Sequence, residues 1–312
     1  MRVYKMMFRK GSKKKLLEAA FLSSFLFPND NFINNLNIIG ENHSHFSIHV
    51  SPDKFTLAIS NSNYSTLSIL DNKTFSEVNI PDINTFECKW SPDSKKMLIM
   101  RSNFNDRKRK NSLIVLNKDG ETYRTVINYT DKKIFPLGWT GENTFHFLLD
   151  NQLVTSNLKG ERLEWDFPLV YAIGNKLYKK VNESDSKLIY EANDVILNLS
   201  YSKNALLLAF EVYGDQTLII ENDRFIIDDI KNGFYPKISP DGTLIVFMTL
   251  QDDGYRINKG DIYVWNSVTR IISPVANNME KIEMNPHWIN NEMIYFIDLE
   301  NGSLNSAEVK LK

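Results

Sequence analysis

Short runs of alternating apolar and polar residues, separated by turn signals, make up most of this chain. The most regular signal is the tripeptide Ser-Pro-Asp, which occurs at residues 51–53, 91–93 and 239–241. An alternating run precedes each copy and a longer apolar run follows it. Because proline presets φ for a tight turn and aspartate can bond its own backbone, each copy predicts a strand, a turn and a second strand. The pattern therefore predicts an all-β protein built from repeats.

Alignment on this turn divides the chain into units of four strands. In the second unit the expected strands are Phe86–Trp90, Met97–Met100, Ser112–Leu116 and Tyr123–Ile127. Four short strands per repeat are typical of a β-propeller blade. The other units are expected to begin near Phe46, Pro136, Val195, Tyr235 and Met284.

The number of blades depends on the abbreviated stretch between Trp165 and Val195. Its Gly174-Asn175 dipeptide lies between alternating runs and predicts a hairpin. Counted as one short blade, this stretch gives a seven-bladed propeller; if it elaborates a neighbouring blade, the number is six. The last unit lacks one strand, and we expect residues 32–39 to supply it by pairing with that blade. This N-terminal strand would close a single propeller domain over residues 32–312.

The best copy of the repeat covers residues 234–247, Phe-Tyr-Pro-Lys-Ile-Ser-Pro-Asp-Gly-Thr-Leu-Ile-Val-Phe, and Gly-Asp-Ile-Tyr-Val-Trp-Asn follows at 260–266. This pattern resembles the TolB-like (WD40-like) β-propeller repeat, although the copies at 50–54 and 90–94 lack the glycine. The resemblance implies a disc whose innermost strands line a central channel. It also implies a role in holding proteins or peptides, in members that are often exported or periplasmic. Similar propellers also precede peptidase domains or form sugar-acid lyases.

Charge and motifs exclude several classes of function. Lys and Arg number 37 against 38 Asp and Glu, so the whole molecule has no net field to attract nucleic acid or an anionic membrane. The chain contains no nucleophile elbow and no glycine-rich nucleotide loop, and we expect no cofactor. The one cysteine, Cys88, cannot form an internal disulfide, which leaves the compartment open.

Residues 1–31 form a separate N-terminal segment. A basic stretch over residues 9–15 precedes an apolar run, Leu16–Phe27, that Glu18 interrupts. Two hypotheses fit this pattern: a degenerate export signal, or a short amphipathic helix. The run is too short to span a bilayer, and no other segment is a candidate for crossing one. The protein is therefore either exported, in the periplasm or at the cell surface, or cytoplasmic.

Two groups of residues are candidates for binding. Arg107, Lys108, Arg109 and Lys110 form a basic run that we expect in the connection between two strands of the second blade, where it could dock an acidic partner. The second group is a set of tryptophans just before the repeat turn, namely Trp90, Trp139 and Trp288. Their recurrence at one position indicates packing between blades, and a ring of aromatics near a channel mouth could also hold a peptide or sugar.

His43, His45 and His49 are candidate metal ligands. If a strand extends back to Glu41, its period of two places these histidines on one face. Imidazoles on one face suit a transition metal. The alternative is that they line the channel or a loop as ordinary polar residues.

Taken together, these patterns favour a non-catalytic, monomeric propeller that binds a protein, peptide or glycan at a channel mouth. The competing hypothesis is a metal-assisted lyase or hydrolase that uses His43, His45 and His49, with Glu41 assisting.

Overall fold

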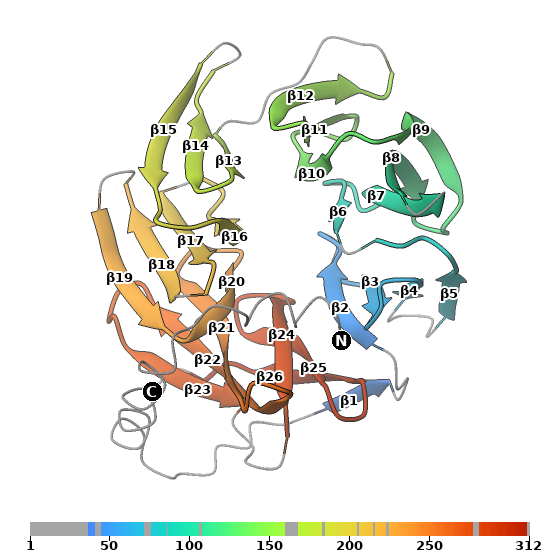
Figure 1. Ribbon diagram of the computed structural model, residues 1–312. Coiled ribbons are helices and arrows are strands. Elements are labelled where there is room, and N and C mark those ends of the chain that lie inside the picture. The colour runs from blue at the N-terminus through green and yellow to red at the C-terminus, as the bar shows by residue number, and fades with distance from the viewer. Residues whose placement is uncertain are drawn as a thin grey trace.

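The computed structural model describes residues 37–40, 45–71, 76–85, 87–105, 108–159, 168–182, 185–204, 206–214, 216–222, 225–276 and 281–310. The N-terminal segment of residues 1–31 lies outside these ranges. Twenty-six strands are formed in the described residues, and they make seven separate antiparallel sheets around a common centre (Figure 1). The prediction of a seven-bladed β-propeller is therefore confirmed, and the alternative of six blades is wrong.

Each blade is built from consecutive strands, the first of which lies innermost in the ring. Blades 1 and 2 contain β2 (His45–Val50), β3 (Thr56–Asn61), β4 (Leu67–Asp71), β5 (Ser76–Ile80), β6 (Cys88–Trp90), β7 (Lys96–Asn105), β8 (Lys108–Asn117) and β9 (Thr122–Thr130). Blades 3 and 4 contain β10 (Ile134–Trp139), β11 (Thr144–Leu149), β12 (Gln152–Asn157), β13 (Leu169–Ile173), β14 (Lys176–Lys180) and β15 (Ser186–Glu191). Blade 5 contains β16 (Ile196–Tyr201), β17 (Leu207–Val212), β18 (Gln216–Glu221) and β19 (Phe225–Lys231). Blades 6 and 7 contain β20 (Gly233–Ile238), β21 (Leu244–Asp252), β22 (Ile257–Asn266), β23 (Ile272–Ala276), β24 (Glu283–Trp288), β25 (Met293–Asp298) and β26 (Ser303–Glu308), with β1 (Asn37–Gly40) outermost.

The abbreviated stretch is a blade of its own. Blade 4 has three strands, and the described residues between β15 and β16 pass directly into blade 5 without a fourth. Blade 3 also has three described strands; residues 160–167, which follow β12, fall outside the described residues.

The N-terminal strand closes the ring as expected. Asn37 pairs with Ser306 and Ile38 with Asn305 in an antiparallel ladder between β1 and β26. The pairing involves residues 37–40, at the end of the predicted stretch of 32–39. Blade 7 is thus built from both ends of the described chain (Figure 1).

The core is divided among the seven blade interfaces. Seven clusters of buried apolar side chains each combine residues of two neighbouring blades. In β7, Met97 and Ile99 pack toward blade 1, whereas Leu98 and Met100 pack toward blade 3. This explains why the second strands of blades 2 and 6 contain long apolar runs, Met97–Met100 and Leu244–Met248, since both of their faces are buried. In the described residues, no helix has the length and apolarity needed to span a membrane.

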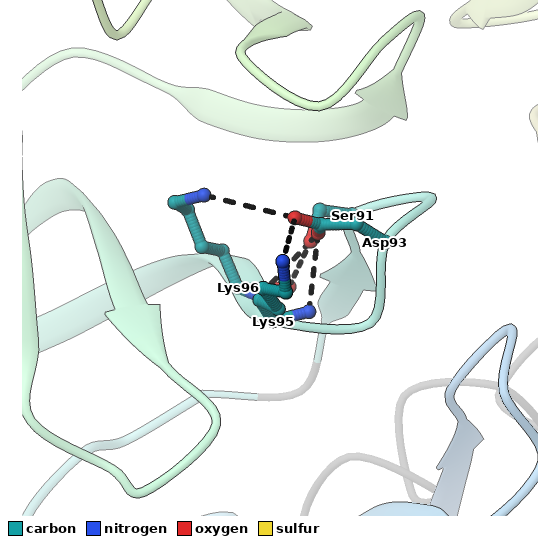
Figure 2. A network of polar contacts seen from close by, with 4 residues as sticks. All are labelled: Ser91, Asp93, Lys95 and Lys96. Atoms are coloured by element: carbon teal, nitrogen blue, oxygen red, sulfur yellow. Dashed lines mark hydrogen bonds and ion pairs between the residues drawn. The ribbon is translucent and has the colours of Figure 1, made fainter.

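The Ser-Pro-Asp turns are held by their own side chains. Figure 2 shows the copy in blade 2, where Ser91 Oγ donates to Asp93 Oδ1 at 2.6 Å and accepts the Lys96 amide at 2.9 Å. Asp93 Oδ1 also accepts the Lys95 amide at 3.1 Å. Equivalent bonds recur at Ser51, Ser202 and Ser239. These residues therefore shape the turns, and their carboxylates are occupied by backbone groups.

The fourth position of the turn explains why the glycine is dispensable. This residue is left-handed in three copies, with φ of 68° at Lys54, 59° at Ser94 and 79° at Gly242. Glycine adopts such angles without strain, and other residues do so at a moderate cost. Ser94 has a second role, because its Oγ accepts the Asp53 amide of blade 1 at 2.8 Å and so links two blades.

Candidate binding surfaces

The three tryptophans of the sequence pattern form hydrogen bonds between blades. Each indole Nε1 donates to a backbone carbonyl of the preceding blade: Trp90 to His49 at 2.9 Å, Trp139 to Lys89 at 2.8 Å, and Trp288 to Lys237 at 2.8 Å. The rings pack against the apolar cluster of the same interface. Their described contacts are thus those of packing between blades, and a role in holding a ligand stays a prediction.

The accepting residues occupy one structural position, two residues before the turn. In blades 6, 7, 1 and 2, which follow one another around the ring, this position holds Lys237, His287, His49 and Lys89. In blades 3, 4 and 5 it holds only small residues, Gly138, Ala172 and Ser200. We call the first four residues the basic arc. They lie on innermost strands and are all half-buried.

The basic arc surrounds one carboxylate. Lys89 Nζ lies 2.9 Å from Glu87 Oε2, and these side chains keep 34% and 22% of their surface exposed. Burial alone would raise the pKa of Glu87. The positive charges of Lys89, His49 and Lys237 have the larger effect together, so the pKa of Glu87 is lowered. Burial alone would lower the pKa of Lys89. The negative charge of Glu87 has the larger effect, so the pKa of Lys89 is raised. This pair is therefore ionised.

Lys237 lies opposite this pair, across the channel. Burial and the charge of Lys89 lower its pKa to about 8, against the opposing effects of Glu87 and Glu211. Since Lys89 and Lys237 belong to blades 2 and 6, they can act on each other only across the centre of the ring. Lys237 Nζ lies 4.3 Å from the centre of the Tyr235 ring, a cation–π contact.

Bulges in the innermost strands place three of the four residues of the basic arc, His49, Lys237 and His287. The ladder of β20 and β21 shifts register between Phe234 and Lys237, where Tyr235 has φ of 56°. Similar shifts occur in β2, β10, β16 and β24. A bulge bends the strand and redirects the side chains that follow it. Pro236 lies inside such a bulge, where its missing N–H removes no ladder bond.

One of these bulges also corrects the prediction for the histidines. His45 pairs with Asn61 but Ser47 pairs with Ser60, so one extra residue lies between them. The bulge shifts the alternation of side chains. His45 and His49 therefore lie on opposite faces of the strand, whereas the sequence pattern predicted one shared face. His49 contacts Ser47 at 3.3 Å and affects the pKa of Glu87, whereas the charge that acts on His45 is that of Glu77.

His43 and Glu41 lie outside the described residues. Among the residues that are described, no group of three or more His, Cys, Asp or Glu side chains could hold a metal ion. The three-histidine metal site therefore stays a prediction.

The basic run differs from its expected setting. Lys108, Arg109 and Lys110 are not in a loop but in β8, because the hairpin of β7 and β8 continues for ten residues on each side. The Arg109 guanidinium donates to Ser102 Oγ at 2.9 Å and to Asn111 Oδ1 at 3.1 Å, which satisfies polar groups inside the extension. Arg107 lies outside the described residues. Phe104, in the same hairpin, is 67% exposed.

A second long hairpin, formed by β21 and β22, has an ordered tip. Asp253 Oδ1 accepts the amides of Tyr255 and Arg256 at 2.9 and 3.0 Å, and Asp252 Oδ1 accepts that of Gly254 at 2.8 Å. Tyr255 is 87% exposed at this tip. Sequence reasoning did not single out this aromatic residue.

Both long hairpins project from the same face of the ring. Each joins the second and third strands of its blade, whereas the Ser-Pro-Asp turns join the first and second. Because adjacent strands are antiparallel, the two kinds of connection lie on opposite faces. We call them the hairpin face and the turn face. The basic arc, two residues before the turns, lies near the turn face.

Comparison with known proteins supports the fold and no more. No protein-family profile matches the chain, and no curated protein sequence matches it. Its structure is similar to the β-propeller domain of Myceliophteria thermophila Cps50 (Swd1), with a TM-score of 0.59 and 15% identity over 89% of this chain and 100% of that one. It is also similar to Kluyveromyces lactis Hsv2, with a TM-score of 0.56 and 8% identity over 87% of this chain and 95% of that one. At such low identity the likeness establishes a β-propeller, and the TolB-like assignment stays a prediction.

Proposed function

We propose that this propeller is a non-catalytic, monomeric scaffold that binds a protein or peptide partner on the hairpin face, at the mouth of the channel. The observation that carries the proposal is Tyr255, a large aromatic side chain exposed at the tip of a turn in which Asp253 accepts two backbone amides. Rigid, exposed aromatic residues bind with a small loss of conformational entropy, and they dominate many interfaces.

The hairpin of blade 2 supports the same conclusion. It presents Phe104 on the same face, together with the exposed cations Lys108 and Arg109. An apolar anchor beside positive charge suits a partner segment that combines an apolar or aromatic residue with acidic ones. Blades 2 and 6 are three blades apart around the ring, so a partner that contacts both hairpins would lie across the mouth.

The test is a quantitative cross-linking capture from cells that produce the protein, with a Tyr255→Ala, Phe104→Ala double variant. Val268 provides the matched control, because it is 81% exposed and joins the third and fourth strands of blade 6, on the turn face. We expect the double variant to lose a protein that the wild type and Val268→Ala both capture. Equal capture by all three proteins, or a captured species that is a glycan, would overturn the proposal.

A further inference from the structure

Lys237 is a cation of the channel that has no ion-pair partner among the described residues. In that part of the chain its ammonium forms no hydrogen bond and no ion pair, and it lies over the Tyr235 ring. A buried or half-buried ammonium is normally paired, because burial without a partner disfavours the charge. The two nearest carboxylates are committed elsewhere: Glu87 pairs with Lys89, and Glu211 accepts the Asn198 amide at 2.8 Å.

The composition of the ring is uneven around this cation. The basic arc occupies four consecutive blades, and the facing position in the other three blades is filled by glycine, alanine and serine. Two lysines and two histidines against the two carboxylates Glu87 and Glu211 also give this half of the channel an excess of hydrogen-bond donors.

We propose that Lys237 and Lys89 bind a small oxyanion, a carboxylate or a phosphate group, in the channel near the turn face, with His49 and His287 lining the site. An oxyanion would supply the partner that Lys237 lacks, and charge-assisted hydrogen bonds to ammonium groups are among the strong ones in proteins. Glu87 weakens binding of the oxyanion, because its negative charge lies next to Lys89 and repels the negative charge of the ligand. This site uses other residues than the proposed partner surface and lies near the opposite face of the ring. An experiment can therefore refute one proposal without refuting the other.

Isothermal titration calorimetry of the full chain tests this site with two probes, inorganic phosphate and acetate, against chloride at matched ionic strength. We expect one or both oxyanions to bind and chloride not to bind; the pair of probes distinguishes a phosphate site from a carboxylate site. Lys237→Met should weaken binding by about tenfold or more, which is the loss of one hydrogen bond to a charged group. Glu87→Gln should tighten it several-fold.

The control is Lys95→Met, which removes the same charge from the turn of blade 2, where the side chain is 73% exposed. We expect this variant to bind like the wild type. If Lys237→Met does not fold, the opposite effect of Glu87→Gln still tests the site. The inference is refuted if wild-type protein binds neither oxyanion, if chloride binds equally well, or if Lys237→Met and Glu87→Gln both leave the affinity unchanged.

Discussion

Replacing Lys237 by methionine is expected to stabilise the folded chain at neutral pH. The charged form of this lysine is disfavoured on folding, since its pKa falls from 10.5 to about 8. That difference corresponds to roughly 3 kcal/mol at neutral pH. Solvent screening of the half-buried side chain reduces the effect to about 2 kcal/mol. The lost contact with Tyr235 removes about 0.5–1 kcal/mol. A net gain of about 1 kcal/mol remains for the variant.

The pH dependence gives the sign of the effect independently. Below the folded-state value of about 8 both states carry the proton, so the unfavourable contribution is fully present. Between about 8 and 10.5 the folded state releases the proton first, and the contribution disappears as the pH rises. Wild type should therefore approach the stability of Lys237→Met in that window.

Urea unfolding, followed by tryptophan fluorescence at about pH 7 and about pH 9.5, measures both quantities. Lys95→Met is again the control, and its stability should match that of wild type. A Lys237→Met protein that is less stable than wild type at neutral pH, or whose advantage grows with pH, would refute the reasoning. A confirmed gain would mean that the chain retains a destabilising cation, as proteins commonly do at functional sites.

Two further predictions concern the ring itself. Deletion of residues 1–40, which removes β1, should lower the melting temperature of the whole ring in one calorimetric transition; a separate early transition confined to blade 7 would contradict this. Changing Trp90, Trp139 and Trp288 to phenylalanine keeps an aromatic ring but removes the bond to the preceding blade, and should lower the free energy of unfolding by about 1 kcal/mol each, additively, in urea titrations. Unchanged stability of the triple variant would show that these bonds contribute nothing.

Local signals in the sequence were sufficient for most of the architecture. Ser-Pro-Asp fixes a turn through bonds that span five residues at most, so its meaning does not depend on distant parts of the chain. The same holds for Gly174-Asn175, which identified blade 4. The closing strand was predictable from a different argument, the missing strand of blade 7, and its described residues, 37–40, overlap the predicted stretch of 32–39.

The failures have a common physical origin in irregular strand geometry. A bulge adds one residue without any mark in the pattern of polar and apolar positions, and it separated His45 from His49. The run Lys108–Lys110 looks like a loop because it is polar, yet hydrogen bonds of Arg109 to Ser102 and Asn111 keep it in a strand.

The basic arc was within reach of sequence reasoning but required a different comparison. Its members are separated by up to 238 positions, from His49 to His287. Comparing the residue two before each turn across all units would have revealed two lysines and two histidines in the first two and the last two repeats. Their meeting at the channel follows from ring closure, which no single repeat encodes.

The pairing of Asn37 with Ser306 also has a consequence for synthesis of the protein. These partners are 269 positions apart, so β1 leaves the ribosome long before β26 exists. At about 5–20 residues per second, the interval is roughly 15–50 s. During this time β1 has an unsatisfied edge and six blades can form without a closed circle. A nascent chain would therefore spend most of its synthesis as an open arc, and a chaperone that covers β1 in this period would act on the step that decides between closure and aggregation.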